Sequence, residues 1–271
     1  MAEIGRGDIQ APMVDAHAHI FTQAIPFADN AHSRPVYDYS VEDYIADLDR
    51  FGIACGVLSA ASLYGDNNDY TLAALQAHSR LRSTIIAKPD IGASTLRAMA
   101  DRGVIGVRLM WRRMNEFPDL EEEPYRGFFR RIADCGLIVE LLAKSGDLPA
   151  LLPPILESGV RVVVDHFGAP SPGEGAVGPG MDMLLRSVES GRLWVKLSSG
   201  FRMPFEVADA CTRRLLSEAG PGRLLWGSDA PFVNHEDSTN FENVLALYFR
   251  LVPDGDTRSA IDQTALELFF S

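Results

Sequence analysis

The chain contains 271 residues, of which 46% are hydrophobic and 23% charged, a composition ordinary for a globular protein with a sizeable core. Its formal net charge of −12 argues against a nucleic-acid partner, because binding phosphates needs a basic surface. No run of about 18 apolar residues offers a membrane span. The first 13 residues are polar and lack the pattern of a signal peptide, so we expect a cytoplasmic protein.

Eight short segments rich in leucine and β-branched residues are predicted to be buried strands. They are residues 13–20, 56–60, 83–88, 106–110, 137–142, 161–166, 193–198 and 224–229. Their starts recur about every 30 residues, which is the length of a strand, a helix and two turns. This spacing predicts a repeated strand-helix unit.

Amphipathic stretches between these segments predict helices. In the first, Ser40 is expected to cap a helix with Glu42 and Asp43 in its first turn, and Gly52 to end it. The others are residues 69–80, 94–102, 125–134, 148–158, 180–190, 206–219, 240–251 and 256–270. Strands that alternate with helices demand a parallel sheet. Eight strands favour closure of this sheet into a (β/α)8 barrel, the α/β fold also called a TIM barrel. We expect a single domain over residues 1–271.

The connections after strands one, four, six and eight are long, whereas the turns into the strands are short. The long ones are residues 21–39, 111–124, 167–179 and 230–239. In β/α barrels the loops that follow the strands build the active site. We therefore expect a pocket covered by loops at the C-terminal ends of the strands.

Four residues with useful chemistry fall at these strand ends. His17 and His19 are two apart on the first strand, so both point to the same face, which in a barrel is the interior. His166 ends the sixth predicted strand and Asp229 the eighth. Because the first and eighth strands of a closed barrel are neighbours, Asp229 is expected beside the two histidines. Asp15 is expected to face the interior below His17, where it either orients His17 or is a buried structural acid.

These motifs resemble the amidohydrolase superfamily. VDAHAHIF on strand one, VVVDHFG on strand six and LLWGSDAPF on strand eight carry the resemblance, which is greatest to the branch of pyrone-dicarboxylate and sugar-acid lactonases. SLYGDNNDY, GVRLM and KLSSGFRM extend it over nearly the whole chain. The resemblance implies a catabolic hydrolase that opens a carboxylated lactone.

The resemblance also implies roles for single residues. Asp229 would be the general base that takes a proton from the attacking water, and His17, His19 and His166 would bind and polarise the lactone carbonyl. Donor groups around such a carbonyl stabilise the oxyanion that develops on it. The sequence departs from the pyrone-lactonase pattern at Ala169, where that family has an arginine, so a less charged or bulkier lactone is expected.

Other residues are candidates for substrate binding. Arg108 and Arg202 match positions that bind substrate carboxylates in the families that the sequence resembles, and Arg112 or Arg113 could also bind a carboxylate. Each could instead form a surface salt bridge. Ser62 and Tyr64 could donate hydrogen bonds to the substrate, or serve the turn in which they lie. Lys196, within strand seven, could pair with an acid in the barrel or reach the site.

A metal ion is one of two possibilities for the chemistry. His17, His19 and Asp229 offer three nitrogen or oxygen ligands for one divalent ion, zinc or else manganese. Many superfamily members add a histidine on strand five, which is missing here, and Glu140 is the nearest candidate there. The lactonase branch also includes members that work without a metal, so metal-free catalysis stays open.

Three alternatives compete with the lactonase hypothesis. A metal-dependent decarboxylase of a carboxylated ring or a lactone isomerase would use a similar set of residues. A barrel kept only as a binding module would have a broken or blocked rim. In each enzymatic case the expected partner is a small anionic substrate, and the acidic exterior fits a monomer or a homodimer.

Overall fold

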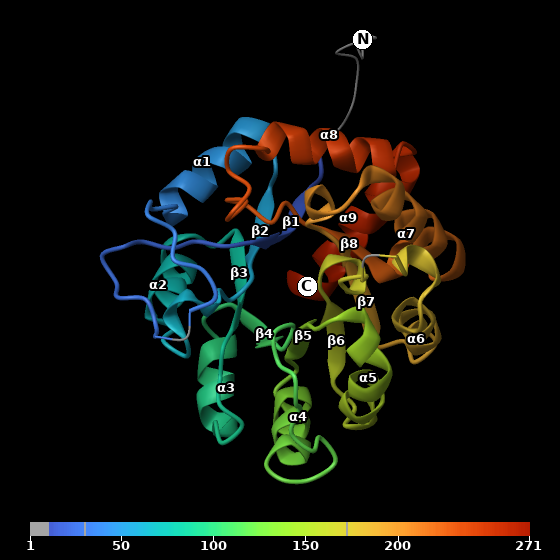
Figure 1. The fold of residues 1–271 in the computed structure, drawn as a ribbon. Coiled ribbons are helices and arrows are strands. Elements are labelled where there is room, and N and C mark those ends of the chain that lie inside the picture. Colours follow the sequence, from blue (N-terminus) through green and yellow to red (C-terminus); the bar gives the residue numbers. More distant parts are fainter. Residues whose placement is uncertain (1–10, 30, 172) are drawn as a thin grey trace.

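Eight parallel strands form one sheet whose order follows the chain, from β1 to β8, with the helices outside it (Figure 1). The computed structural model describes residues 11–29, 31–171 and 173–271. The polar segment 1–10, on which most of the signal-peptide prediction rests, lies outside them. In the described residues no helix is long and apolar enough to cross a membrane. The predicted (β/α)8 barrel is confirmed.

The strands are short and buried. They are β1 (Val14–Ala18), β2 (Cys55–Leu58), β3 (Leu81–Ile85), β4 (Val104–Met110), β5 (Ile138–Leu142), β6 (Arg161–Val164), β7 (Leu193–Leu197) and β8 (Leu224–Trp226). The helices are α1 (Val41–Phe51), α2 (Asp69–Ala77), α3 (Ala93–Ala100), α4 (Tyr125–Asp134), α5 (Leu148–Glu157), α6 (Pro179–Val188), α7 (Phe205–Glu218), α8 (Phe241–Leu251) and α9 (Gly255–Phe269).

The ends of α1 show why this stretch folds as predicted. Ser40 Oγ accepts a hydrogen bond from the Asp43 backbone N–H, and Asp43 in turn accepts one from the Ser40 N–H. This reciprocal capping satisfies two donors that the first turn leaves unpaired. Gly52 ends the helix at φ 72°, a left-handed conformation that glycine adopts without steric cost.

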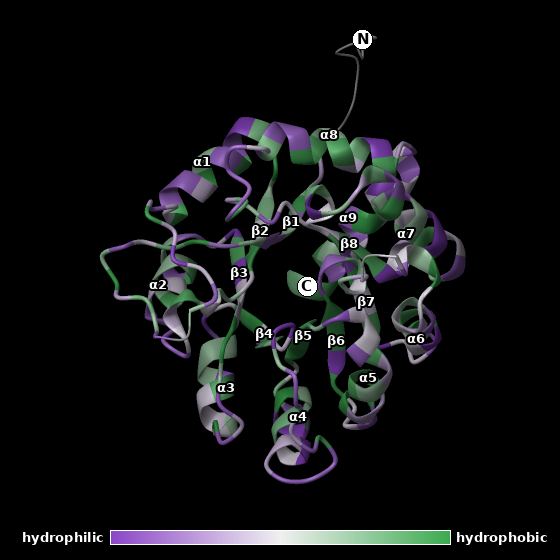
Figure 2. Ribbon diagram, in the orientation of Figure 1, coloured by the Kyte–Doolittle hydropathy of each residue, from purple (hydrophilic) through white to green (hydrophobic). Residues whose placement is uncertain are grey.

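The lower half of the barrel interior is apolar and closed. Val14, Val57, Val163 and Leu225 pack there with Phe269 of α9, the last helix, which lies across the N-terminal end of the barrel (Figure 1). Figure 2 shows hydrophobic residues concentrated on the strands and on the helix faces turned toward them. Apolar packing thus fills one end, which leaves the C-terminal end for a site.

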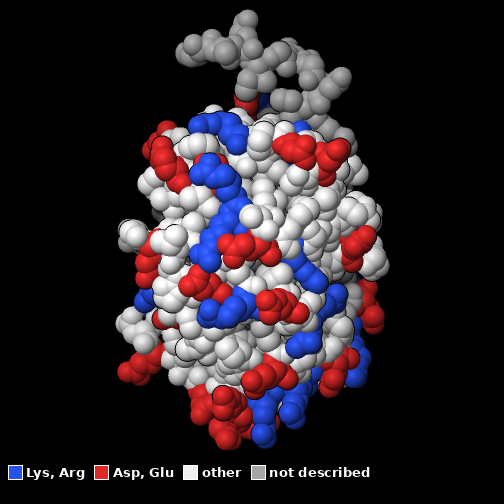
Figure 3. Space-filling model, turned by 90° about the vertical axis from the view of Figure 1, so that its right-hand side faces the viewer, with Lys and Arg blue, Asp and Glu red and all other residues white. Residues whose placement is uncertain are grey.

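On the side that carries α6 and α7, acidic and basic residues are interspersed (Figure 3). That face has no extended basic surface of the kind that phosphate backbones need.

The seam between β1 and β8 is closed by side chains as well as backbone. Asp15 accepts hydrogen bonds from Ser228 N at 2.8 Å and from Ser228 Oγ at 2.6 Å. Asp15 also accepts one from Tyr44 Oη at 3.1 Å and one from the backbone N–H of His17. Asp15 is therefore a buried structural acid, the second of its two predicted roles. β1 also shifts register against β2 between Asp15 and Ala18.

Strands six and eight end earlier than predicted. β6 stops at Val164 and β8 at Trp226, so His166 and Asp229 lie in the turns beyond them. Both residues have positive φ, 55° and 62°, which turns the chain out of the strand direction. These turns aim the two side chains across the mouth of the barrel.

Candidate active site

A cavity of about 520 Å³ lies over the C-terminal ends of the strands. His19, His166 and Asp229 line it, and His17 lies just beneath, fully buried. The lining carries five cationic side chains, those of Arg108, Arg112, Arg113, Lys144 and Arg202. Among the described lining residues Asp229 is the single acid. The rim is therefore open and electropositive, unlike the blocked rim expected of a non-catalytic barrel.

His17, His19 and Asp229 form a close triangle. The two Nε2 atoms lie 3.3 Å apart, and Asp229 Oδ1 lies 3.6 Å from His17 Nε2 and 3.4 Å from His19 Nε2. The backbone of β1 enforces this, because the Asp229 N–H donates to the His17 carbonyl at 2.8 Å. The predicted proximity of Asp229 to both histidines is thus present in the structure.

Ser59, at the end of β2, orients both imidazoles. His19 Nδ1 donates to the Ser59 carbonyl at 2.7 Å, so its Nε2 faces the cavity. Ser59 Oγ lies 3.0 Å from His17 Nδ1, where the Lys196 ammonium also lies at 3.1 Å. This orienting role was not predicted; the signal available in the sequence was a serine at a strand end.

Beneath the triangle lies a fully buried layer of two acids and two cations. Arg108 contacts Glu140 at 3.1 Å and Asp165 at 2.8 Å, and Lys196 contacts the same acids at 3.0 and 3.4 Å. Burial alone would raise the pKa of Asp165, but Arg108 and Lys196 more than offset this and lower it to about 2. Lys196 therefore pairs with acids in the barrel, one of its two predicted roles.

Glu140 belongs to this layer rather than to the triangle. Its Oε2 accepts a hydrogen bond from Thr84 Oγ1 at 2.8 Å, and its Oε1 lies 3.6 Å from His17 Nδ1, the nitrogen that faces away from Asp229. Sequence reasoning missed Asp165. The signal available in the sequence was its position, next to His166 at the end of an apolar strand.

Asp229 is held ionised, with Oδ1 beside the His17 and His19 Nε2 atoms and Oδ2 on the side of Ser199 and Arg202. Its Oδ2 accepts hydrogen bonds from Ser199 Oγ and, at 3.0 Å, from Arg202 Nε. Burial would raise the pKa of Asp229, but the hydrogen bond from His19 and nearby positive charge, including Arg202, hold that pKa well below its ordinary value.

His17 and His166 are neutral at neutral pH. Burial lowers the pKa of His166 to about 4 and the pKa of His17 well below its ordinary value. His166 Nδ1 lies 2.8 Å from Ser198 Oγ, which leaves its Nε2 for the cavity. An ionised carboxylate among neutral imidazoles can accept a proton from water.

The predicted substrate-binding residues divide into two groups. Arg108, Arg113, Arg202 and Ser62 line the cavity, although Arg108 is only 2% exposed. Tyr64 does not line it, because its hydroxyl is hydrogen-bonded to the backbone N–H and carbonyl of Thr22. Tyr64 thus ties the loop after β1 to the segment after β2.

The triangle also has the geometry of a metal site. Tetrahedral zinc with bonds of about 2.0–2.2 Å holds neighbouring ligand atoms about 3.4 Å apart, and the three atoms here are 3.3 to 3.6 Å apart. His17, His19 and Asp229 therefore fit one small divalent ion. Arg108 Nη2, 3.5 Å from His17 Nε2, places a permanent positive charge at the same spot.

Comparison with known proteins defines the class. The family model described as amidohydrolase matches residues 14–270, so the chain belongs to this family. It is 28% identical over 261 residues to a 4-sulfomuconolactone hydrolase of Rhizobium radiobacter, covering 91% of this chain and 86% of the relative. It is 29% identical over 247 residues to a 2-pyrone-4,6-dicarboxylate hydrolase of Comamonas testosteroni, covering 84% and 80%.

A solved structure agrees. A protein of Acinetobacter baumannii, described as a 2-pyrone-4,6-dicarboxylic acid hydrolase and holding citric acid, superposes with a TM-score of 0.89 at 28% identity, covering 95% of this chain and 99% of that one. More distant matches include a D-galactarolactone isomerase and, for the fold alone, a dihydroxybenzoate decarboxylase and a zinc-containing amidohydrolase. The chain is accordingly a lactonase-like hydrolase.

Proposed function

We propose that the chain hydrolyses a small carboxylated lactone and that Asp229 is the general base. The observation that carries this proposal is an ionised carboxylate, with Oδ1 facing an electropositive cavity and Oδ2 held by Ser199 and Arg202. The names of the two curated relatives, both lactone-ring hydrolases, support the reaction class.

The reaction follows from the positions of the groups. Asp229 Oδ1 takes a proton from a water molecule, and the resulting hydroxide attacks the lactone carbonyl carbon. The carbonyl oxygen becomes an oxyanion, which donors at His166 Nε2 and Arg108 Nη2 stabilise. The intermediate then collapses, the ring C–O bond breaks, and the leaving alkoxide takes the proton back from Asp229. The product is a hydroxy acid.

Charge selects the substrate. Arg113 at the cavity wall suits a carboxylate on the lactone, since a guanidinium fork matches two oxygens at once. Arg202 adds positive charge to the same wall, while Asp229 and Val233 hold its own fork. Ala169 lines the cavity where the resembling pyrone lactonases carry an arginine. We infer that the substrate makes one anionic contact fewer than a pyrone dicarboxylate does.

A divalent ion, zinc or manganese, would be held by His17, His19 and Asp229, and when bound it would supply positive charge to the lactone carbonyl. Arg108 supplies positive charge at the same place from the chain itself. Because that charge is permanent, we infer that turnover does not depend on the ion.

The test is a panel of carboxylated lactones, aromatic-derived and sugar-derived, assayed with purified protein. A product heavier than the substrate by one water, measured by mass spectrometry, together with release of one proton per turnover, supports the proposal. A product of unchanged mass would support the isomerase alternative, and release of CO₂ the decarboxylase. Absence of turnover over the whole panel would overturn the proposed function.

A further inference from the structure

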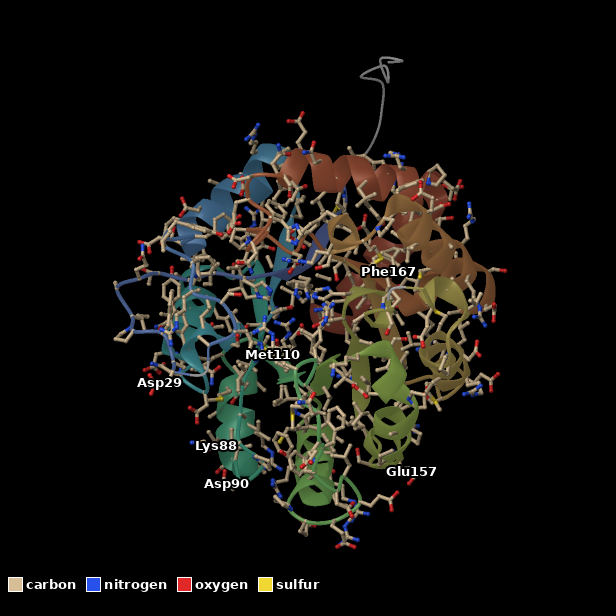
Figure 4. The ribbon with its side chains drawn as sticks, viewed as in Figure 1. Asp29, Lys88, Asp90, Met110, Glu157 and Phe167 are labelled. Carbon is tan, nitrogen blue, oxygen red and sulfur yellow. The ribbon has the colours of Figure 1, made fainter. Side chains whose placement is uncertain are left out.

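A second hollow of about 230 Å³ opens beside the active-site cavity. It is bounded by Ile86, Ala87 and Pro89 after β3, by Met110 and Trp111 at the end of β4, and by Tyr125 of α4. We call it the side pocket. Met110 and Ser62 line both the side pocket and the main cavity, so the two spaces are adjacent. Figure 4 shows Met110 toward the barrel axis and Lys88 at the periphery, so the side pocket extends outward from the site.

The side pocket differs from the main cavity in chemistry. Its outer wall is aromatic and apolar: the Trp111 and Tyr125 rings meet edge to face at 5.9 Å, above the fully buried Phe128. Its polar lining, from His32, Ser62 and Arg108, lies on the side that it shares with the main cavity. Of its described lining residues only Arg108 is charged, and Glu140 and Asp165 already pair with that guanidinium. An uncharged apolar group would bind favourably here, whereas an anion would lose its hydration without gaining a free cationic partner.

The walls are held in place by side-chain hydrogen bonds. Asn68 bonds both the N–H of Ile86, at 3.1 Å, and its carbonyl, at 2.9 Å. Arg131 of α4 donates to the carbonyls of Pro89 and Ile91. The segment that forms the outer wall is thus anchored on two sides. A preformed pocket binds a ligand without the cost of ordering its walls.

Size and access also suit a substituent of the substrate. A cavity of about 150 Å³ accommodates benzene, so the side pocket has room for an aryl ring or a short alkyl chain. Met110, which separates the two spaces, is half-buried and unbranched, and such side chains repack readily around a ligand.

We propose that the side pocket receives an uncharged apolar substituent, an aryl ring or short alkyl chain, carried by the lactone whose ring lies in the main cavity. The proposal rests on the lactone hydrolysis proposed above and adds to it the class of substituent. The cations of the main cavity and the apolar walls of the side pocket then recognise opposite ends of one molecule.

The test compares two probes, γ-butyrolactone-γ-carboxylate and its phenyl-substituted derivative. We expect wild-type kcat/KM to be at least tenfold higher for the phenyl lactone. Ala87→Leu, which fills the side pocket from its half-exposed wall, should reduce this preference at least tenfold, chiefly through KM. Ala87→Ser, which adds no apolar bulk, should keep the preference within threefold.

Equal kcat/KM for the two lactones in the wild type, or an equal loss for both in Ala87→Leu, would overturn the proposal. Turnover of neither lactone would count against the proposed function alone. The proposal for the side pocket is then tested by the binding of phenylacetate. Phenylacetate should shift the Trp111 indole NMR signal, assigned with Trp111→Phe, in the wild type but not in Ala87→Leu. Shifts of equal size in both proteins, or none in either, would overturn the proposal.

Discussion

Arg202 Nε lies 3.0 Å from Asp229 Oδ2, and this contact fixes the carboxylate with its other oxygen, Oδ1, beside the His17 and His19 Nε2 atoms. The guanidinium is itself fixed, because both of its terminal nitrogens donate to the Val233 carbonyl at 3.2 Å. One arginine thus orients the proposed base and helps to keep it ionised.

Arg202→Gln should therefore change the pH dependence as well as the rate. The pKa of Asp229 lies well below its ordinary value, so the wild-type acid limb of kcat/KM that belongs to this group should fall below pH 3.8. Without Arg202 the pKa of Asp229 rises, and the limb moves to higher pH. We expect kcat/KM to fall about tenfold or more, as one charge-assisted hydrogen bond is lost. A pH–rate profile checks this, and a limb that did not move would contradict the role of Arg202.

The charged layer should be the most mutation-sensitive part of the interior. Lys196→Met leaves Glu140 and Asp165 with one cation between them, and removing one partner of a buried pair costs about 3–5 kcal/mol. Glu140→Gln added to Lys196→Met should recover part of this loss. Urea unfolding measures both variants.

Lys88→Met is the matched control, because its ion pair with Asp66 is exposed. We expect no measurable change in the free energy of unfolding for this variant. A loss equal to that of Lys196→Met would show that the layer holds no special share of the stability.

Asp262 of α9 should make part of the stability depend on pH. Burial raises its pKa from 3.8 to about 6. The folded chain therefore binds a proton here more tightly than the unfolded chain, so stability rises as the pH falls from above 6 toward 3.8. Between pH 7 and pH 5 this contribution is about 1 kcal/mol.

Asp262→Asn removes that titration while keeping the shape. The stability of the wild type relative to Asp262→Asn should increase by about 1 kcal/mol when the pH is lowered from 7 to 5. Chemical denaturation of both proteins at the two pH values measures the difference, and a difference that stayed constant would contradict the raised pKa.

The sequence allowed the barrel and the convergence of its polar residues to be predicted, because both follow from periodicity. His17 and His19 are two residues apart on a strand, which predicted that they share one face. The first and last strands of a closed barrel are neighbours, which predicted that Asp229 lies beside them. Which of its two predicted roles Asp15 takes could not be predicted, since that depends on contacts with Ser228 and Tyr44, which lie far from it in the chain. The pairing of Lys196 with Asp165 likewise depends on the register between the consecutive strands β6 and β7, which periodicity alone does not fix.

Removal of metal should leave the reaction running. Chelator-treated protein is expected to keep at least a third of its kcat/KM, because Arg108 holds a positive charge 3.5 Å from His17 Nε2 without an ion. Metal analysis by mass spectrometry, paired with activity before and after dialysis, checks this. A loss of more than a hundredfold that zinc or manganese restores would show that the ion is required.

The most direct measurement is the turnover of Asp229→Asn on the lactone that the panel identifies. Asparagine tolerates the positive φ of this position, so the fold should persist, and circular dichroism can verify that. Because an amide cannot take the proton from water, we predict that kcat/KM falls by about 10²–10⁴. A correctly folded Asp229→Asn protein with a kcat/KM within threefold of the wild type would contradict Asp229 as the base.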